Sequence, residues 1–149
     1  MSGGIFLGNK ILDISIVAAF IAQFWKVINP IFKGKKPRWD RMWQTGGMPS
    51  SHSASVTSLA TSVGILNGHR SVEFAIAVVF SIIIMYDAAG VRRAAGKQAG
   101  VLNRLIHSLG KKDNSIKIEV ELKELIGHTP FEVLVGAVLG FFVAFLLMK

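Results

Sequence analysis

Apolar residues gather in four stretches of the chain, and each stretch has about the length of a helix that crosses a lipid bilayer. A helix rises about 1.5 Å per residue, so crossing the hydrocarbon core takes roughly 20 mainly apolar residues. The four predicted spans cover residues 11–32, 51–67, 71–89 and 130–148. This pattern predicts an all-α fold, a polytopic membrane helix bundle with about four transmembrane helices.

The second predicted span is more polar than the others. Between residues 53 and 62 six side chains are hydroxyls: Ser53, Ser55, Thr57, Ser58, Thr61 and Ser62. We expect such a helix to lie inside the bundle, with its small hydroxyl side packed against neighbouring helices. The first span carries Gln23 and Lys26, and we expect the end that holds them to reach the membrane interface.

A further helical pattern follows the third span. From Gly90 to Leu109 apolar residues return at helical spacing on one side, while basic residues lie mostly elsewhere. This predicts a cytoplasmic amphipathic helix that continues from the third span or lies along the interface. Residues 116–126 combine the alternation of a strand with a helical ending, and a short helix is predicted because a single strand has no partner.

The composition agrees with a membrane protein and limits its chemistry. Of the 149 residues, 51% are hydrophobic and only 17% are charged, and there is no cysteine. The apolar content excludes a disordered chain, and the lack of cysteine excludes disulfides and thiolate chemistry. We expect one membrane-embedded domain over residues 1–149.

The positive charge of the chain is concentrated in two loops. The formal net charge is +8, and of the 17 Lys and Arg residues five lie between the first two spans and eight between the last two. The positive-inside rule therefore predicts a multi-pass protein of the cell (inner) membrane, with both loops in the cytoplasm and both termini outside. This split charge fits anionic lipid headgroups, and nucleic acid is not expected as a partner.

A glycine-rich loop precedes the second span and leads to a histidine. The sequence TGGMPSSHSA (residues 45–54) contains a tight turn, which includes Gly47, and a helix start that Ser50 or Ser51 can cap. The free N–H groups at such a helix start favour a phosphate group, and His52 would lie beside it. A capped membrane helix with an interfacial histidine explains the same residues equally well.

A second candidate motif stands at the start of the last span. Thr129 as N-cap, Pro130 at the first helical position and Glu132 at the third form a capping box, which accounts for these residues without any chemistry. The box does not account for His128 directly before it. A carboxylate that fixes one imidazole nitrogen leaves the other free as nucleophile or base, so His128 and Glu132 are candidate catalytic residues.

The third motif lies at the end of the third span. Asp87 is followed at five and six residues by Arg92 and Arg93, and then by Lys97. One interpretation is a charge pair that ends the span. In the other, the three cations form a clamp for phosphoryl oxygens, which guanidinium groups contact bidentately. The predicted topology brings this motif to the same membrane face as both histidines.

Three blocks occur in order along the chain: PSSHSA, YDAAGVRRAAGKQA and GHTPFEVLVGAVLG. In this combination the chain resembles the divergent branch of the type 2 phosphatidic acid phosphatase (PAP2) superfamily, whose relatives include lipid phosphatases and vanadium haloperoxidases. The resemblance covers roughly residues 5–149. It implies that His128 is the nucleophile, that Glu132 is its orienting carboxylate, and that His52 is the acid for the leaving group.

The chain departs from the wider superfamily in its basic residues. The superfamily's first block, a Lys with an Arg-Pro seven residues on, has no exact counterpart. Its candidates are Lys35, Lys36, Arg38 and Arg41. The Arg expected six residues before the nucleophilic His falls on Leu122, and Arg92 and Arg93 are expected to replace it.

Motifs and resemblance together predict an integral membrane, phosphatase-like lipid hydrolase. It would hydrolyse a phosphomonoester or diphosphate of a membrane lipid, a phospholipid or polyprenyl phosphate, through a phosphohistidine at the cytoplasmic face. No metal or other cofactor is expected. The predicted phosphate-binding residues are Arg92, Arg93, Lys97, Ser50, Ser51, Lys36 and Arg38, with Asp87 and Gly47 in support.

Other classes of protein fit part of the pattern. A non-enzymatic membrane protein could bind or translocate an anionic lipid headgroup in the same cationic pocket. A serine hydrolase built on Ser50 or Ser51 with His52 is a weaker alternative, because no third partner is placed. A metal site is a further alternative, with His52, His128, Asp87 and Glu132 as its ligands. Gly136 and Gly140 form a GxxxG pair that serves either a contact within the chain or a homodimer.

Overall fold

A computed structural model describes residues 6–43, 46–112, 122 and 127–149. Within these ranges the chain forms helices and loops and no β-strand, which confirms the all-α prediction for this part of the chain. The helices are α1 (Lys10–Ile28), the short 3-10 helices η1 (Asn29–Lys33) and η2 (Trp39–Met42), α2 (Ser51–Asn67), α3 (Val72–Ala89), α4 (Val91–Lys112) and α5 (Pro130–Leu147). The helix predicted over residues 116–126 lies outside the described residues, apart from Leu122.

Capping residues set where the helices begin. Asn9 accepts hydrogen bonds from two backbone N–H groups of the first turn of α1. Ser50, Ser71 and Thr129 cap α2, α3 and α5 in the same way. At the other end of α1, Pro30 lacks an N–H group and disfavours helical geometry before it, so α1 gives way to a 3-10 turn.

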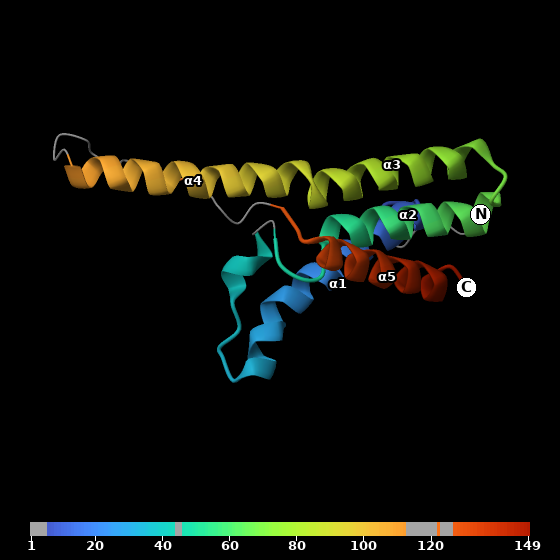
Figure 1. Ribbon diagram of the computed structural model, residues 1–149. Helices are drawn as coiled ribbons and strands as arrows, with labels where there is room; N and C mark the ends of the chain where they lie inside the picture. Colours follow the sequence, from blue (N-terminus) through green and yellow to red (C-terminus); the bar gives the residue numbers. More distant parts are fainter. Residues whose placement is uncertain (1–5, 44–45, 113–121, 123–126) are drawn as a thin grey trace.

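α2 is the central helix of the bundle. It packs against α1, α3 and α5, while α1 and α5 contact each other less extensively. Figure 1 shows α2 and α5 running side by side, with α3 along the other side of α2. The hydroxyl side chains of Ser53, Ser58 and Ser62 are completely buried. The predicted placement of this polar helix inside the bundle is confirmed.

Three helical stretches of the described chain are long and apolar enough to cross a membrane: Lys10–Phe32, Val72–Leu109 and Pro130–Leu147. α2 has only 17 residues and is not among them. Its polarity is explained by packing against other helices rather than lipid. The protein is therefore a helical membrane bundle in which three candidate spans surround a shorter, more polar helix.

Two glycines let α5 approach the backbone of α2. A β-carbon at Gly136 would lie 2.4 Å from the carbonyl oxygen of Ser50, and one at Gly140 would lie 2.1 Å from that of Ala54. No side chain fits at either position, so the GxxxG pair is used within the chain. This contact fixes the spacing of the N-terminal ends of α2 and α5.

Replacing Gly140 with alanine is expected to destabilise the bundle by about 1–3 kcal/mol, because the added methyl group pushes α5 away from the α2 backbone. Val138→Ala, at an exposed position of the same helix, is the matched control and should cost much less. The measurement is the free energy of unfolding in detergent micelles. Equal stability of the two variants would contradict the close approach of the helices.

α4 continues from α3 as a second long helix, as predicted for residues 90–109. The backbone angles of Gly90, φ −104° and ψ −82°, interrupt the helix between them. Figure 1 shows α4 extending beyond the bundle along the line of α3. The side chain of Asn103 binds both the N–H and the carbonyl of Leu122, which ties that residue to α4.

Candidate active site

Main-chain hydrogen bonds join the helix ends that carry the three motifs. The N–H of His128, just before α5, donates to the carbonyl of Ala88 at the end of α3 at 2.9 Å. The N–H of Ser50, just before α2, donates to the carbonyl of Glu132 at 3.1 Å. The start of α2, the end of α3 and the start of α5 therefore meet at one end of the bundle (Figure 1).

His52 and His128 lie next to each other at this end. Their ring centroids are 6.5 Å apart, and the ring planes are inclined by 65°. His128 is buried, with 3% of its surface exposed, whereas His52 in the first turn of α2 is exposed. The two imidazoles stand 76 positions apart in the sequence, yet they lie side by side, one buried and one exposed.

Glu132 faces His128 and closes the capping box with the same oxygen. Its Oε2 lies 3.4 Å from His128 Nδ1 and accepts a hydrogen bond from the N–H of Thr129 at 2.9 Å. The hydroxyl of Thr129 accepts a bond from the N–H of Glu132 in return, so the predicted capping box is confirmed. Because Nδ1 faces the carboxylate, Nε2 is the nitrogen of His128 that is suited to contact a substrate.

The surroundings of His128 favour its neutral form. Burial lowers the pKa of His128 below its ordinary value of 6.5, and the nearby Lys26 ammonium lowers it further. The Glu132 carboxylate raises the pKa, but this effect is smaller than the other two together. The ring is therefore neutral at neutral pH, which is the form that a nucleophile requires.

The loop before α2 has the conformation that its glycines predict. Gly47 has a φ of +78°, in the left-handed region that other residues rarely adopt. The side-chain oxygen of Ser50 accepts the N–H of Ser53 at 3.3 Å, and Ser51 is the first residue of α2. The positive end of the α2 dipole therefore lies beside His52, where it favours an anion.

Lys26 is a site residue that none of the three motifs contains. Its side chain is only 2% exposed, and its ammonium group donates to the side-chain oxygen of Gln23 at 3.1 Å. It lies close enough to His52, His128 and Glu132 to interact electrostatically with each of them. α1 turns this side chain into the bundle, and the expectation that this end of the first span reaches the membrane interface stays a prediction.

The spacing of residues along α1 indicates that Lys26 lies on the buried face of the helix. Ala18 and Ala22 precede Lys26 by eight and four residues, lie on the same face of the helix and are completely buried. A lysine in register with two small buried residues points toward neighbouring helices. Gln23 strengthens this end of α1, because its side-chain nitrogen donates to two backbone carbonyls of η2.

In the motif at the end of the third span, Asp87 and Arg92 form the predicted ion pair. Arg92 Nε lies 2.5 Å from Asp87 Oδ2, and both residues are close enough to His52 to act on its charge. Arg92 stays about half exposed. Arg38 is also exposed and pairs with Asp40. Within the described residues, no ion pair or hydrogen bond links either histidine to Lys36, Arg38, Arg93 or Lys97.

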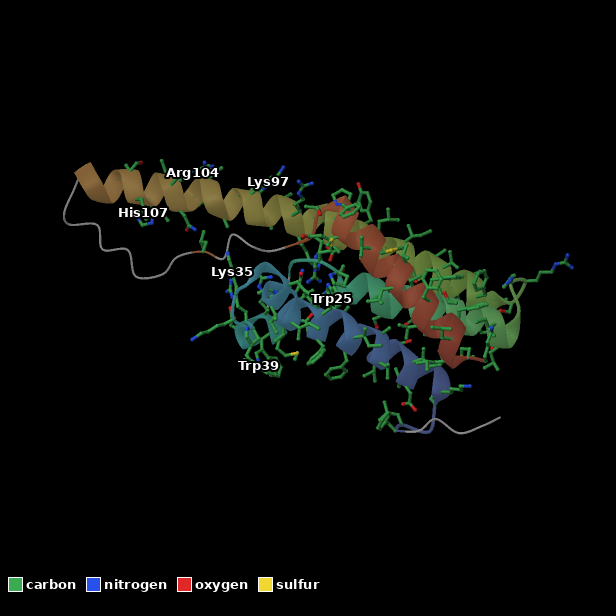
Figure 2. All side chains as sticks on the ribbon, turned by 90° about the horizontal axis from the view of Figure 1, so that it is seen from below. Trp25, Lys35, Trp39, Lys97, Arg104 and His107 are labelled. Carbon is green, nitrogen blue, oxygen red and sulfur yellow. The ribbon has the colours of Figure 1, made fainter. Side chains whose placement is uncertain are left out.

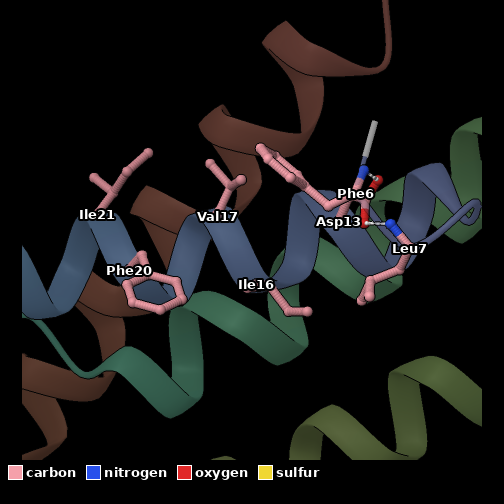
Figure 3. A pocket seen from close by; sticks show the side chains of 7 residues that line it. All are labelled: Phe6, Leu7, Asp13, Ile16, Val17, Phe20 and Ile21. Carbon is pink, nitrogen blue, oxygen red and sulfur yellow. Dashed lines mark hydrogen bonds between the residues drawn. The ribbon is translucent and has the colours of Figure 1, made fainter. Parts of the chain in front are cut away.

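An apolar groove lies along the N-terminal half of α1, at the opposite end of that helix from Lys26. Figure 3 shows that Ile16, Val17, Phe20 and Ile21 line it. Asp13 is its acidic residue, and this carboxylate accepts the N–H groups of Phe6 and Leu7 at 3.0 and 3.1 Å. Because the Asp13 carboxylate is already bonded to backbone N–H groups, the groove offers mainly apolar surface. Such a surface is suited to contact lipid acyl chains and not to catalyse a reaction.

The site near the histidines has the composition of an anion site. It combines two imidazoles, one carboxylate, a buried ammonium group and a helix N-terminus. Among the residues with described positions, no group of three or more His, Cys, Asp or Glu side chains is placed to hold a metal ion. Positive groups outnumber the single carboxylate next to His128, which favours a ligand with several oxygen atoms.

Fold and site together define a helical membrane protein with a cationic two-histidine site at one end of its bundle. The chain belongs to the divergent PAP2 family, whose sequence profile matches residues 7–143. It is similar to the uncharacterized membrane protein YuiD of Bacillus subtilis (strain 168), with 41% identity over 143 residues that cover 90% of each chain. No solved structure matches it. The family resemblance of the three motifs is thereby confirmed.

Proposed function

We propose that the protein is a membrane lipid phosphatase that transfers a phosphoryl group from a lipid to His128 and then to water. The observation that carries this proposal is the pair of imidazoles 6.5 Å apart beside the buried Lys26. A nucleophile stands about 3–3.5 Å from the atom it attacks, and a proton donor about 3 Å from its acceptor. With the ring centroids 6.5 Å apart, both imidazoles are near enough to act on one substrate, one on phosphorus and the other on the leaving oxygen.

In the first step, neutral His128 attacks phosphorus and the bond from phosphorus to the lipid oxygen breaks. Burial and the Arg92 charge lower the pKa of His52, which makes its protonated form a stronger acid. This form gives its proton to that oxygen, so the lipid leaves as an alcohol or, from a diphosphate, as a monophosphate. Glu132 holds the His128 ring and stabilises its positive charge. Lys26, Arg92 and the N-terminus of α2 stabilise the oxygens of the group in transfer.

In the second step, water attacks the phosphorus of the phosphohistidine. His52, now neutral, takes a proton from that water, and the phosphorus–nitrogen bond breaks. Inorganic phosphate leaves, and both histidines return to their initial protonation states. The balanced reaction consumes one water and uses the residues of this chain alone.

A membrane-held substrate suits the position of the site. The site lies at the start of the candidate span Pro130–Leu147 and at the end of α3, and we propose that this is the depth of the lipid headgroups. The basic loops on this side favour the cytoplasmic face of the cell membrane, with both termini outside. We therefore propose a phospholipid or polyprenyl phosphate as the substrate.

Phosphate release from phosphatidic acid and from a polyprenyl diphosphate, by the protein in detergent, tests this function. Brief reaction with radiolabelled substrate is expected to leave an acid-labile, alkali-stable phosphoryl group on the peptide that contains His128. Binding of these lipids without any turnover would refute the hydrolase. Such a result would favour the alternative function, binding or translocation of an anionic headgroup.

His52→Ala is expected to lose most activity on substrates whose leaving oxygen needs a proton. On a lipid phosphomonoester, the rate of the first turnover should fall by about 10²–10⁴-fold, the usual contribution of a general acid. On p-nitrophenyl phosphate the fall should be much smaller, because that leaving group departs as an anion. Equal losses on the two substrates would show that His52 is not the acid.

The pH profile of kcat/KM is expected to have its acidic limb below the ordinary histidine pKa of 6.5, because burial lowers the pKa of the nucleophile His128. Lys26→Met removes a charge that lowers this pKa, so the limb should move to higher pH. Glu132→Gln removes a charge that raises it, so the limb should move to lower pH. Shifts in the same direction in both variants would contradict the assignment of the limb to His128.

A further inference from the structure

α4 carries an apolar stripe that no described part of the protein covers. The stripe consists of Val91, Leu102, Leu105 and Leu109, which recur at helical spacing and are 46–61% exposed. Asn103, the buried polar residue that binds Leu122, lies on a different side of the helix. The contact between Asn103 and Leu122 therefore leaves the apolar stripe exposed.

The side of α4 opposite the stripe is basic. The 22 residues of the helix include six Lys and Arg residues and no Asp or Glu. Figure 2 shows Lys97 and Arg104 on the part of α4 that extends beyond the bundle, and helical spacing places both on the side opposite Leu102. Helices with one apolar and one basic face are typical of segments that lie in the plane of a membrane surface.

The place of α4 in the chain puts its start at the membrane surface. α3 has 18 residues and is thus about 27 Å long, close to the thickness of the hydrocarbon core. α4 therefore begins at headgroup depth, where Asp87 and Arg92 form their ion pair. Gly90 interrupts the helix at this point, and a β-carbon there would lie 2.9 Å from the carbonyl oxygen of Tyr86.

We propose that α4 is an interfacial helix that binds the anionic lipid surface next to the site. Its stripe enters the boundary between headgroups and acyl chains, while the basic side contacts lipid phosphates. A turn at Gly90 brings α4 from the line of α3, seen in Figure 1, into the plane of the membrane. The stripe is thereby removed from water.

The charge of α4 favours lipid over a second copy of the chain. Two α4 helices packed stripe against stripe would cover the apolar residues, but the cations on the basic side of each helix would face away from the contact and find no carboxylate on the other helix. Such a pair would satisfy the apolar side of each helix and leave the basic side without opposite charge. An anionic leaflet supplies the opposite charge and an apolar phase together, so it matches both faces of the helix.

Single-cysteine labelling tests the proposal, because the chain has no cysteine of its own. Leu102→Cys on the stripe and Arg104→Cys on the basic side are each labelled with bimane in the full-length protein. The proteins are reconstituted in vesicles of phosphatidylglycerol and phosphatidylcholine, with a nitroxide on the upper acyl chain as the quencher. Ile83→Cys, at an exposed position of α3, reports correct insertion.

We expect several-fold stronger quenching of the label at position 102 than of the label at position 104. The difference should shrink in pure phosphatidylcholine and at high salt, because both weaken the attraction to the surface. Lys97→Glu combined with Arg104→Glu, with the label at position 102, should lose the preference for anionic vesicles while quenching at position 83 is unchanged.

Three results would overturn the proposal. Water exposure of both α4 labels without lipid quenching would mean that α4 stands away from the membrane. Protection of the label at position 102 from aqueous iodide without lipid quenching would mean that protein covers the stripe, from a second copy or from this chain. An unchanged preference for anionic vesicles in the double Glu variant would remove the role of the basic side.

Discussion

Replacement of His128 by alanine is expected to reduce the kcat for lipid phosphate hydrolysis by about 10³-fold or more, because the nucleophile and its covalent intermediate are lost together. Labelling of the protein by radioactive substrate should disappear at the same time. The measurements are phosphate release in detergent and acid-labile labelling of the denatured protein. Both losses should occur with lipid phosphates and with p-nitrophenyl phosphate, because the nucleophile serves every substrate.

The design of this experiment separates chemistry from folding. The backbone N–H of His128, rather than its ring, binds Ala88, so the alanine variant keeps the bond that positions the segment. His69→Ala is the matched control, since His69 packs against Phe74 with ring centroids 5.4 Å apart and lies outside the candidate site. Full activity in His69→Ala is expected. Retained labelling in His128→Ala would refute the phosphohistidine.

Lys26→Met is expected to lower kcat/KM by about 10²–10³-fold, because the buried ammonium supplies fixed positive charge where phosphoryl oxygens gain negative charge. Methionine keeps the length and apolar body of the side chain, so packing in the bundle is retained. The variant should unfold at the same temperature as the wild type or higher, since burial of a charge costs free energy and Lys26 forms no ion pair with a carboxylate of the described residues.

Lys10→Met, at the other end of α1, is the control for loss of a positive charge from that helix. It should leave kcat/KM and the unfolding temperature nearly unchanged. Binding of inorganic phosphate, measured by calorimetry, should weaken in Lys26→Met and stay intact in Lys10→Met. A Lys26→Met protein with normal phosphate binding and normal turnover would show that this lysine has a structural role only.

The helix boundaries were predictable because local chemistry sets them. The predicted spans 51–67 and 71–89 agree with α2 and α3 to within a residue, since Ser50 and Ser71 cap these helices. The predicted first span over residues 11–32 agrees with the candidate span Lys10–Phe32, although the α-helix ends at Ile28 and the last turn is a 3-10 helix, because Pro30 interrupts the α-helical hydrogen bonds. Apolar periodicity alone does not reveal such an end.

The site was predictable only in part. The capping box around Glu132 and the cap at Ser50 follow from neighbouring residues, so the sequence shows them directly. The meeting of His52 with His128 depends on contacts between helices and became an expectation only through motifs and topology. The burial of Lys26 is not among the expectations from the sequence, although its spacing from Ala18 and Ala22 indicates it.

Peptide groups, rather than side chains, connect the segments that hold the two imidazoles. The bonds from Ser50 to Glu132 and from His128 to Ala88 use main-chain atoms, which every residue type except proline provides in full. Substitutions of the surrounding side chains can therefore change which substrate the site binds, while the distance between the His52 and His128 rings stays the same. Among distant relatives, ring spacing is expected to persist longer than the identity of the flanking cations.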